Sequence, residues 1–392
     1  MQIKIDDFDD LGNGLGKIDN KVCFVNKGLP NEVLNIEITK NTKSYINAKI
    51  NKIIAPSKER LKPICPFYDV CGGCNFLHAT KYLENEFKIQ KGKKFLGSIN
   101  KLYETIEFNY RNKVIFHVKK GEIGFYKTNT NQLIKINYCY LLDDEINKIL
   151  ELFNKHVDNN FTGEILIRVN SLKETLVSIT GNYQYTNILI NSNLINNLIY
   201  NSKVLKGNNY FLEYINDYKF KVSYLSFFQV NHQGLENIIN ILSNFLKDKN
   251  INIALDLYSG TSVLGIIMAR YVQKVISVEE VKVATLDALE NKKLNKINNL
   301  EVINGKVEDY IDTFKNIDLV VVDPARRGLD KKTINYLKTI KSNYLIYIAC
   351  KMDSLKRDLY DLKEIYDVSS INLVDMFPRT NHVESVCVLK LR

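Results

Sequence analysis

The sequence predicts an α/β protein of three regions, and three observations support this prediction. From about residue 229 to 392, apolar strand-like runs alternate with helical spans, which is typical of a parallel, doubly wound sheet. Residues 1–55 show short runs of alternating apolar residues between glycine and proline turns, which indicate a small OB-like β-barrel. Residues 56–228 hold a cysteine cluster, a helical stretch and then several strand-like runs, so we expect a central α+β domain.

The bulk composition favours a soluble protein with a polyanionic partner. The chain has 392 residues and a formal net charge of +10. This length suits two or three domains, and a basic surplus favours nucleic acid, because each phosphate contact releases counterions. No apolar run is long enough to span a bilayer, and the first residues lack an export pattern. We therefore expect a cytoplasmic protein that binds no membrane and remains a monomer.

A nucleoside-binding turn is predicted at the start of the third region. A strand-like run at residues 253–257 leads into the small residues Ser259, Gly260 and Thr261. A glycine in such a turn lets the backbone approach a ligand closely. Glu279 closes the next strand-like run and is suited to bind both ribose hydroxyls, although it is equally a residue type found at solvated strand ends. Since neither GxGxxG nor a phosphate loop is present, an adenosyl cofactor without a pyrophosphate is favoured.

Two further strand ends carry reactive groups. Asp323 and Pro324 follow the run at residues 318–322, and Cys350 follows the run at residues 344–348. Ligands of open α/β sheets bind beyond the carboxyl ends of the strands, so we expect both side chains at one site. Most buried cysteines are inert core residues. The position of Cys350 at a strand end, beside Lys351 and near Asp323, suits a reactive thiolate as well, so position alone leaves both interpretations open.

Five segments resemble the RNA uracil-5-methyltransferases that carry a TRAM domain and an iron-sulfur cluster. That family has DLYCGxG, VxGVE, DPPRxG, SCNP with a downstream TLxRD, and DxFPxTxHVE. The present chain has DLYSGTS, VISVE, DPARRG, ACKMDSLKRD and VDMFPRTNHVE in the same order. The resemblance covers nearly the whole chain. It implies a Rossmann-like methyltransferase domain that uses S-adenosyl-L-methionine (SAM), with Cys350 as nucleophile, Glu384 as base and Asp323 in the active site.

The segment FFQVN also resembles the family and implies that Gln229 contacts SAM. Tyr258 and Glu279 fall on the cofactor positions of the family, and Asp323 lies where cofactor and substrate would meet. The implied reaction explains the need for a cysteine. Carbon 5 of uracil is a poor nucleophile until a thiolate adds to carbon 6, and a base must later remove the proton from carbon 5. Glu384 is the expected base, with His382 as the alternative.

The implied substrate is a uridine in folded RNA. We expect 23S ribosomal RNA, with transfer RNA and a cytosine substrate as alternatives. Two departures from the family pattern, Ala325 for the second proline of DPPR and Lys351 for the asparagine after the nucleophile, raise a different alternative. The chain would then be a degenerate RNA-binding protein without catalysis. Retention of Cys350, Asp323 and Glu384 argues against it.

Three cysteines in C-x5-C-x2-C spacing, Cys65, Cys71 and Cys74, predict a metal site. This spacing allows zinc or an iron-sulfur cluster, and the fourth ligand could be His78 or the distant Cys139. The family resemblance implies a 4Fe-4S cluster with Cys139 as the fourth ligand.

Overall fold

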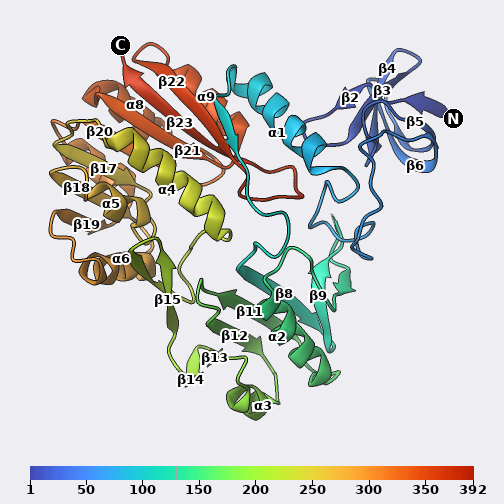
Figure 1. Cartoon of the computed structure of the whole chain (residues 1–392), viewed down its shortest axis with the longest axis horizontal. Coiled ribbons are helices and arrows are strands. Elements are labelled where there is room, and N and C mark those ends of the chain that lie inside the picture. Colours follow the sequence, from blue (N-terminus) through green and yellow to red (C-terminus); the bar gives the residue numbers. More distant parts are fainter. Residues whose placement is uncertain (129) are drawn as a thin grey trace.

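The computed structural model describes residues 1–128 and 130–392. Strands form four sheets, and Figure 1 shows them in three regions that follow the chain from the N-terminal sheet through a central part to a large C-terminal sheet. No helix in the described part of the chain is both long and apolar enough to cross a membrane.

The N-terminal region is a sheet of six strands in the order β1-β5-β6-β4-β3-β2. Its inner face is filled by alternate residues such as Ile5, Val25 and Leu34, which are fully buried. The strands are β1 (Gln2–Lys4), β2 (Asp7–Phe8), β3 (Gly14–Ile18), β4 (Lys21–Asn26), β5 (Val33–Asn41) and β6 (Tyr45–Ala55). The strand-rich region expected at residues 1–55 is thus confirmed.

The first run of the chain is used twice in this sheet. Its start, β1, pairs with β5, and its end, β2, pairs with β3. The glycines of β3 allow the first run of the chain to pass close to its backbone. A Cβ at Gly16 would lie 2.4 Å from the carbonyl oxygen of Lys4, and one at Gly14 would lie 2.8 Å from Ile5. The OB-like closure of this sheet remains a prediction.

The central region contains a seven-stranded sheet in the order β10-β9-β8-β11-β12-β13-β14. Helix α2 (Asp144–Lys155) buries Ile146, Ile149 and Phe153 in the apolar cluster on this sheet. The elements are β8 (Lys113–Lys119), β9 (Glu122–Tyr126), β10 (Leu133–Lys135), β11 (Gly163–Val169), β12 (Thr175–Gly181), α3 (Thr186–Asn191), β13 (Asn197–Tyr200) and β14 (Lys203–Lys206). The hairpin of β15 (Tyr210–Ile215) and β16 (Tyr218–Ser223) follows.

The C-terminal sheet has eight strands in the order β19-β18-β17-β20-β21-β23-β22-β7. Its strands are β17 (Ile253–Leu257), β18 (Lys274–Glu279), β19 (Leu300–Asn304), β20 (Leu319–Val322), β21 (Tyr344–Ala349), β22 (Tyr366–Val374) and β23 (Glu384–Leu391), together with β7 (Lys101–Tyr103). The helices are α4 (His232–Leu246), α5 (Val263–Met268), α6 (Lys282–Leu294), α7 (Val307–Tyr310), α8 (Lys331–Ile340) and α9 (Met352–Leu362), with a short 3-10 turn at Ile311–Thr313.

The sheet is covered on both faces, as expected for a doubly wound fold. One apolar cluster joins α4 and α5 to the sheet through residues such as Leu242 and Ile266. The other joins α8 and α9 through Leu337 and Leu355. In Figure 1, α4 crosses the front of the sheet. This packing buries the central strands on both sides and explains their continuous apolar sequences.

The expectation of a purely parallel sheet is wrong at one strand. β17, β18, β19, β20 and β21 pair in parallel, but β23 is antiparallel to both β21 and β22. Strand β22 and the edge strand β7 were not predicted. β22 begins with exposed polar residues, and β7 has only three residues. β7 precedes the central sheet in sequence but joins the C-terminal sheet. The domain boundaries at residues 55 and 228 remain predictions.

A buried cluster of charges fixes helix α1 (Lys81–Leu96) against the segment that precedes β23. The ammonium of Lys88 is fully buried and contacts Glu84 at 2.5 Å and Asp375 at 2.6 Å. Arg379 joins the cluster, because its backbone N–H donates to Glu84 at 2.8 Å and its guanidinium contacts Glu107 at 2.9 Å. Buried charges are tolerated only when they are paired, so these residues require α1 and residues 375–379 to dock together.

We expect Lys88→Met to destabilise the fold by about 3–5 kcal/mol, because Glu84 and Asp375 lose their fully buried cation and keep only the more distant or less buried contacts with Lys81 and Arg379. Urea unfolding at neutral pH measures this change. Lys148→Met is the matched control. Lys148 pairs with Glu145 on the exposed side of α2, and loss of a surface pair costs about 0–1 kcal/mol. Equal stability of the two variants would contradict the proposed role of the buried cluster.

Candidate active site

The antiparallel pairing of β21 and β23 brings Cys350 and Glu384 together. Ala349 pairs with Ser385, so the next residues on each strand, Cys350 and Glu384, face one another across the ladder. Side chains of directly opposed residues on neighbouring strands lie on the same face of a sheet. Asp323 follows β20, which is the other neighbour of β21. The sulfhydryl and two carboxyl groups therefore meet at the carboxyl edge of the sheet.

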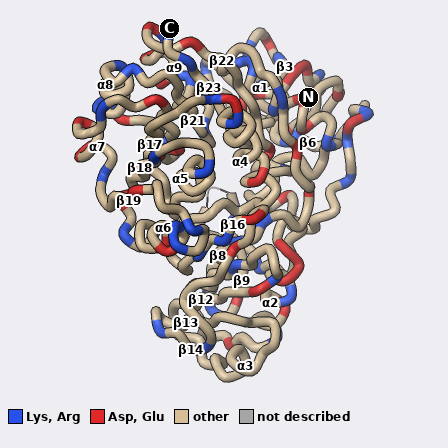
Figure 2. Tube along the Cα trace, turned by 60° about the vertical axis from the view of Figure 1, so that its left-hand side comes forward, with Lys and Arg blue, Asp and Glu red and all other residues tan. Residues whose placement is uncertain are grey.

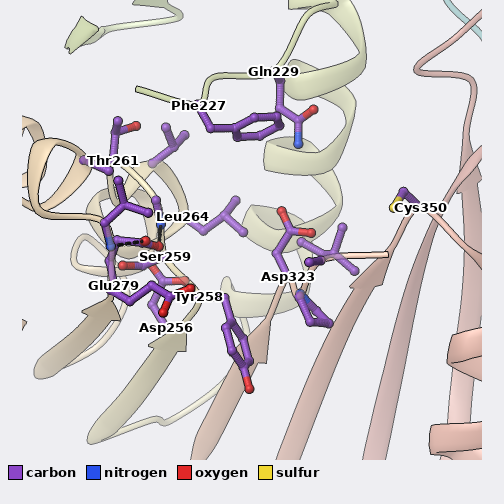
Figure 3. Close-up of a pocket in the computed structure, with 18 of the residues that line it drawn as sticks. Phe227, Gln229, Asp256, Tyr258, Ser259, Thr261, Leu264, Glu279, Asp323 and Cys350 are labelled. Atoms are coloured by element: carbon purple, nitrogen blue, oxygen red, sulfur yellow. Dashed lines mark hydrogen bonds between the residues drawn. The ribbon is translucent and has the colours of Figure 1, made fainter. Parts of the chain in front are cut away.

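All three groups line a cavity of about 1170 Å³. Gln229, Tyr258 and Glu279 line the same cavity, so the structure brings together the six residues that were expected to bind cofactor or catalyse. Figure 3 shows Tyr258 and Glu279 toward one end of this space and Cys350 at the other, with Asp323 between them. The site thus has a cofactor end and a nucleophile end.

The carboxyl groups of Asp323 and Glu384 hold their protons more strongly than usual. Removal from bulk water raises the pKa of Asp323 to about 7. Burial raises the pKa of Glu384 to about 8, and the nearby negative charge of Asp323 adds to this effect, whereas Arg326 opposes it. Such displaced values are typical of functional sites, where burial and like charges meet.

The nucleophile end also contains a cation and a histidine. Burial and the charge of Glu384 raise the pKa of the Cys350 thiol, while Arg326 lowers it. Partial desolvation, followed by the charges of Arg326 and two lysines, lowers the pKa of His382 to about 4. His382 is therefore neutral near pH 7 and lies at the exposed rim of the cavity.

The cofactor end is built from a turn with unusual backbone angles. Tyr258, Gly260 and Ser262 all have positive φ values, of 62°, 54° and 58°, a conformation that costs energy in residues with side chains. Glu279 stabilises this turn, because its carboxylate accepts from the backbone N–H of Gly260 at 2.8 Å and from that of Val281 at 2.8 Å. The turn opens toward the cavity, since a Cβ at Gly260 would meet nothing within 4 Å.

Several residues of the cavity were missed by the sequence analysis as site residues. Asp256 is buried beneath the turn, accepts from Ser277 at 3.1 Å and has a pKa raised to about 7 by burial. The hydroxyl of Ser259 is buried without a hydrogen-bond partner among the described residues, as expected where a ligand supplies one. Phe227 and Arg326 line the wall. Each lies within one to three residues of a predicted site residue. Its place in the same motif could therefore have indicated that it lines the site.

Gln229 reaches the cavity from the loop that precedes α4 (Figure 3). This loop is held from two regions of the chain. Asp287 of α6 accepts hydrogen bonds from the hydroxyls of Ser223 at 2.7 Å and Ser226 at 2.6 Å, and Arg168 of β11 donates to the carbonyl of Ser226. The position of the cofactor-side wall thus depends on contacts between the central and C-terminal sheets.

The four cysteines expected to bind a cluster lie near one another. Cys74 and Cys139 are both half-buried, and partial removal from water raises the pKa of each thiol, that of Cys139 to about 11. Charges on the other thiols add to both shifts, so the side chains of Cys65 and Cys71 are close enough to interact with them. Within the described ranges, however, no three histidine, cysteine or acidic side chains converge in a ready metal site. The thiols are spatial neighbours whose donor chemistry fits an iron-sulfur cluster.

Comparisons with known proteins agree with this geometry. The family described as tRNA (uracil-5-)-methyltransferase matches residues 80–392, and the TRAM domain matches residues 1–50. The chain belongs to the tRNA (uracil-5-)-methyltransferase family. It is accordingly a SAM-dependent RNA methyltransferase with a TRAM domain at its N-terminal end.

Relatives cover nearly the whole chain. An uncharacterized RNA methyltransferase of Clostridium acetobutylicum is 32% identical over 99% of this chain and 96% of its own length. Another from Caldanaerobacter subterraneus is 30% identical over 97% of this chain and 95% of its own length. The crystal structure of Pyrococcus abyssi tRNA (uracil-54, C5)-methyltransferase with S-adenosyl-L-homocysteine superposes with a TM-score of 0.81, covering 99% of this chain and all of that chain at 22% identity. This last similarity establishes the mixed α/β methyltransferase fold.

The displaced pKa of Glu384 predicts how stability varies with pH. The folded pKa of about 8 lies above the usual value of 4.5, so protonation stabilises the fold fully below pH 4.5, and this contribution is lost as pH rises through 8. Glu384→Gln removes the titration. We expect the stability of the variant relative to wild type to increase by a few kcal/mol between pH 5 and pH 9, at about 1.4 kcal/mol per pH unit.

Urea unfolding of both proteins across this range measures the change. Glu364→Gln, at an exposed position, is the control and should show no such trend. A constant difference between Glu384→Gln and wild type at every pH would mean that Glu384 titrates normally.

Proposed function

We propose that this protein methylates carbon 5 of a uridine in RNA through a covalent bond between Cys350 and the base. The observation that carries the proposal is the pairing of β21 with β23, which sets a thiol opposite a buried carboxyl group in the cavity that also contains the cofactor turn. A nucleophile and a proton acceptor at one substrate are the groups that methylation of an unreactive ring carbon requires.

The steps follow from the positions of these residues. Cys350, as thiolate, adds to carbon 6 of uracil and makes carbon 5 nucleophilic, so that carbon 5 takes the methyl group of SAM and releases S-adenosyl-L-homocysteine. Glu384 then accepts the proton from carbon 5. The electron pair of that C–H bond forms the carbon 5–carbon 6 double bond, and Cys350 leaves as thiolate. Asp323, between the two ends of the cavity, contacts both ligands.

The proton acceptor must be ionised when it acts. Because the pKa of Glu384 is near 8, a minority of the free protein has the carboxylate at neutral pH, and this carboxylate is more basic than that of a solvated glutamate. Arg326 lowers the pKa values of both Glu384 and Cys350, so it favours the ionised forms that the reaction uses. His382, neutral near pH 7 and lining the same cavity, is the second candidate for the base.

The cofactor end supports SAM as methyl donor. Glu279 is placed for the ribose hydroxyls, Tyr258 for the adenine side of the turn, and Gln229 for the part of the cofactor nearest the substrate. The unpartnered hydroxyl of Ser259 offers a further hydrogen bond to the ligand. These assignments, like the three domains at residues 1–55, 56–228 and 229–392, are part of the proposal.

For the RNA, we propose 23S ribosomal RNA, bound by a monomer whose OB-like N-terminal barrel grips the RNA. Transfer RNA is the second candidate, favoured by the description of the matching family. A degenerate protein that binds RNA without catalysis is the third. The departures at Ala325 and Lys351 motivate it, but neither residue is a reacting group, and both side chains are exposed.

For the metal site, we propose that Cys65, Cys71, Cys74 and Cys139 hold a 4Fe-4S cluster. The proximity of the thiols supports this proposal. The reaction requires no electron transfer, so the cluster would join the loop at residues 65–74 to the segment before α2. His78 is the alternative fourth ligand: its Nδ1 meets the Tyr68 hydroxyl at 2.5 Å, and its buried Nε2 has no hydrogen-bond partner among the described residues.

A suicide substrate tests the reaction and the RNA together. We expect wild-type protein with SAM to form a covalent adduct on denaturing gels with 5-fluorouridine transcripts of its true substrate, because fluorine cannot leave carbon 5 as a cation. Transcripts of 23S ribosomal RNA and of transfer RNA are tested separately. An adduct with transfer RNA alone would overturn the ribosomal assignment, and no adduct with either would sink the uridine mechanism.

The Glu384→Gln variant separates the two catalytic roles. With ordinary uridine RNA it should accumulate a methylated adduct, because addition and methyl transfer precede the step that needs the base. Cys350→Ala should form no adduct while it still binds SAM. Normal turnover of Glu384→Gln without an adduct would transfer the role of base to His382.

Metal analysis tests the cluster. Protein purified without oxygen should contain iron and acid-labile sulfide, and Cys139→Ser should lose iron as fully as Cys71→Ser. Cys23→Ser is the control, since Cys23 is buried in the N-terminal core, and it should retain iron. Stoichiometric zinc in place of iron would rule out the cluster, and intact iron in Cys139→Ser would point to another fourth ligand.

A further inference from the structure

The turn at residues 9–13 presents a large apolar side chain beside the active-site cavity. Leu11 is 63% exposed, yet its carbonyl oxygen accepts a hydrogen bond from the side chain of Asn381 at 3.0 Å. Asn381 directly precedes His382, which lines the cavity. A residue of the N-terminal sheet therefore lies at the rim of the catalytic site, far away in sequence.

The backbone of this turn is rigid. The Asp9 carboxylate accepts from the N–H of Leu11 at 2.9 Å and from the N–H of Asn13 at 2.7 Å. Gly12 has a φ of +85°, and a Cβ there would lie 2.8 Å from the buried ring of Phe76. Because the backbone is fixed on several sides, the side chain of Leu11 projects from a preorganised position and loses little backbone entropy on contact with a ligand.

Basic side chains of α1 flank the turn. The ammonium of Lys94 contacts Asp10 at 2.6 Å, and that of Lys91 donates to the carbonyl of Asn381 at 3.1 Å. Figure 2 shows lysine and arginine spread over all regions of the chain, so the net charge alone marks no single RNA face. At this rim, two lysines of α1 lie beside the apolar tip, and Asp10 of the turn pairs with one of them.

The proposed reaction gives such a tip a physical role. A uridine inside a stacked helix must leave the stack before Cys350 can reach carbon 6. Proteins that distort nucleic acids often insert an apolar side chain between bases, which compensates for lost stacking. Single exposed apolar residues are common on protein surfaces. Leu11 differs from them in its rigid backbone and in its contact with the segment that carries His382 and Glu384.

We propose that Leu11 is a wedge that enters the RNA stack beside the target uridine and holds the base out toward Cys350. The proposal builds on the proposed function, since it assigns to the N-terminal turn a positioning role in the same reaction. The occupant of this rim is RNA near the target nucleotide, with its phosphates on the lysines of α1.

Fluorescence of 2-aminopurine tests the wedge independently of the chemistry. The probe is a folded RNA fragment that contains the uridine identified by the 5-fluorouridine adduct, with 2-aminopurine next to that uridine. If no adduct forms, a stem-loop from 23S ribosomal RNA takes its place. Wild type with S-adenosyl-L-homocysteine should raise the fluorescence by unstacking. Leu11→Ala should unstack and methylate this RNA about tenfold more slowly or worse, since the truncated side chain no longer fills the space between the separated bases. Leu11→Met should restore most of the rate.

Leu172→Ala is the matched control, because Leu172 is 61% exposed and does not line the cavity. On a short unstructured RNA of the same sequence, the loss in Leu11→Ala should be several-fold smaller. Equal losses on folded and unstructured RNA, or no loss on either, would overturn the wedge. Unstacking by wild type without a 5-fluorouridine adduct would refute the proposed chemistry and leave the wedge standing, and no unstacking by wild type would refute the wedge itself.

Discussion

The buried ammonium of Lys88 is the constraint that joins the N-terminal half of this protein to its catalytic edge. Lys88 and its two carboxylate partners have almost no access to water, so none of the three can be left without the others at an acceptable energy. Asp375 stands at the end of β22, and Glu84 also holds the backbone of Arg379. The segment that leads into β23, and with it Glu384, is therefore positioned by a helix that precedes it by almost 300 residues in sequence.

The same segment receives contacts from the cysteine-bearing loop. The carbonyl of Arg379 accepts hydrogen bonds from the backbones of Asn75 and Phe76, and its guanidinium donates to the carbonyl of Ala79 at 2.9 Å. Cys74 directly precedes Asn75. Order in the cysteine loop is thus transmitted to the strand that carries Glu384 by direct hydrogen bonds.

Reversal of a single strand brings together the proposed catalytic pair, Cys350 and Glu384. If β23 were parallel to β21, its first residue would lie at the opposite edge of the sheet, far from Cys350. Because it runs antiparallel, Glu384 enters the cavity at the same edge as Asp323 and the nucleophile. Burial raises the pKa values of both carboxyl groups, and the nearby charge of Asp323 adds to the shift of Glu384. The arrangement costs stability at high pH and provides a base stronger than a solvated glutamate.

The sequence by itself determined the strand-rich start, the doubly wound architecture and the residues at strand ends. Periodicity locates a strand, and the carboxyl ends of parallel strands meet at one edge. For that reason Asp323, Cys350 and the turn after Leu257 could be grouped without coordinates. The sequence did not reveal β22, whose exposed polar start masks its pattern, and without β22 the direction of β23 could not be inferred. The short link between β22 and β23, residues 375–383, does not permit the crossover that a parallel pair needs. Tertiary structure alone decided that Cys350 faces Glu384 and that Leu11 reaches the same rim, because contacts between segments hundreds of residues apart follow from packing and the pairing of buried charges, neither of which local pattern encodes.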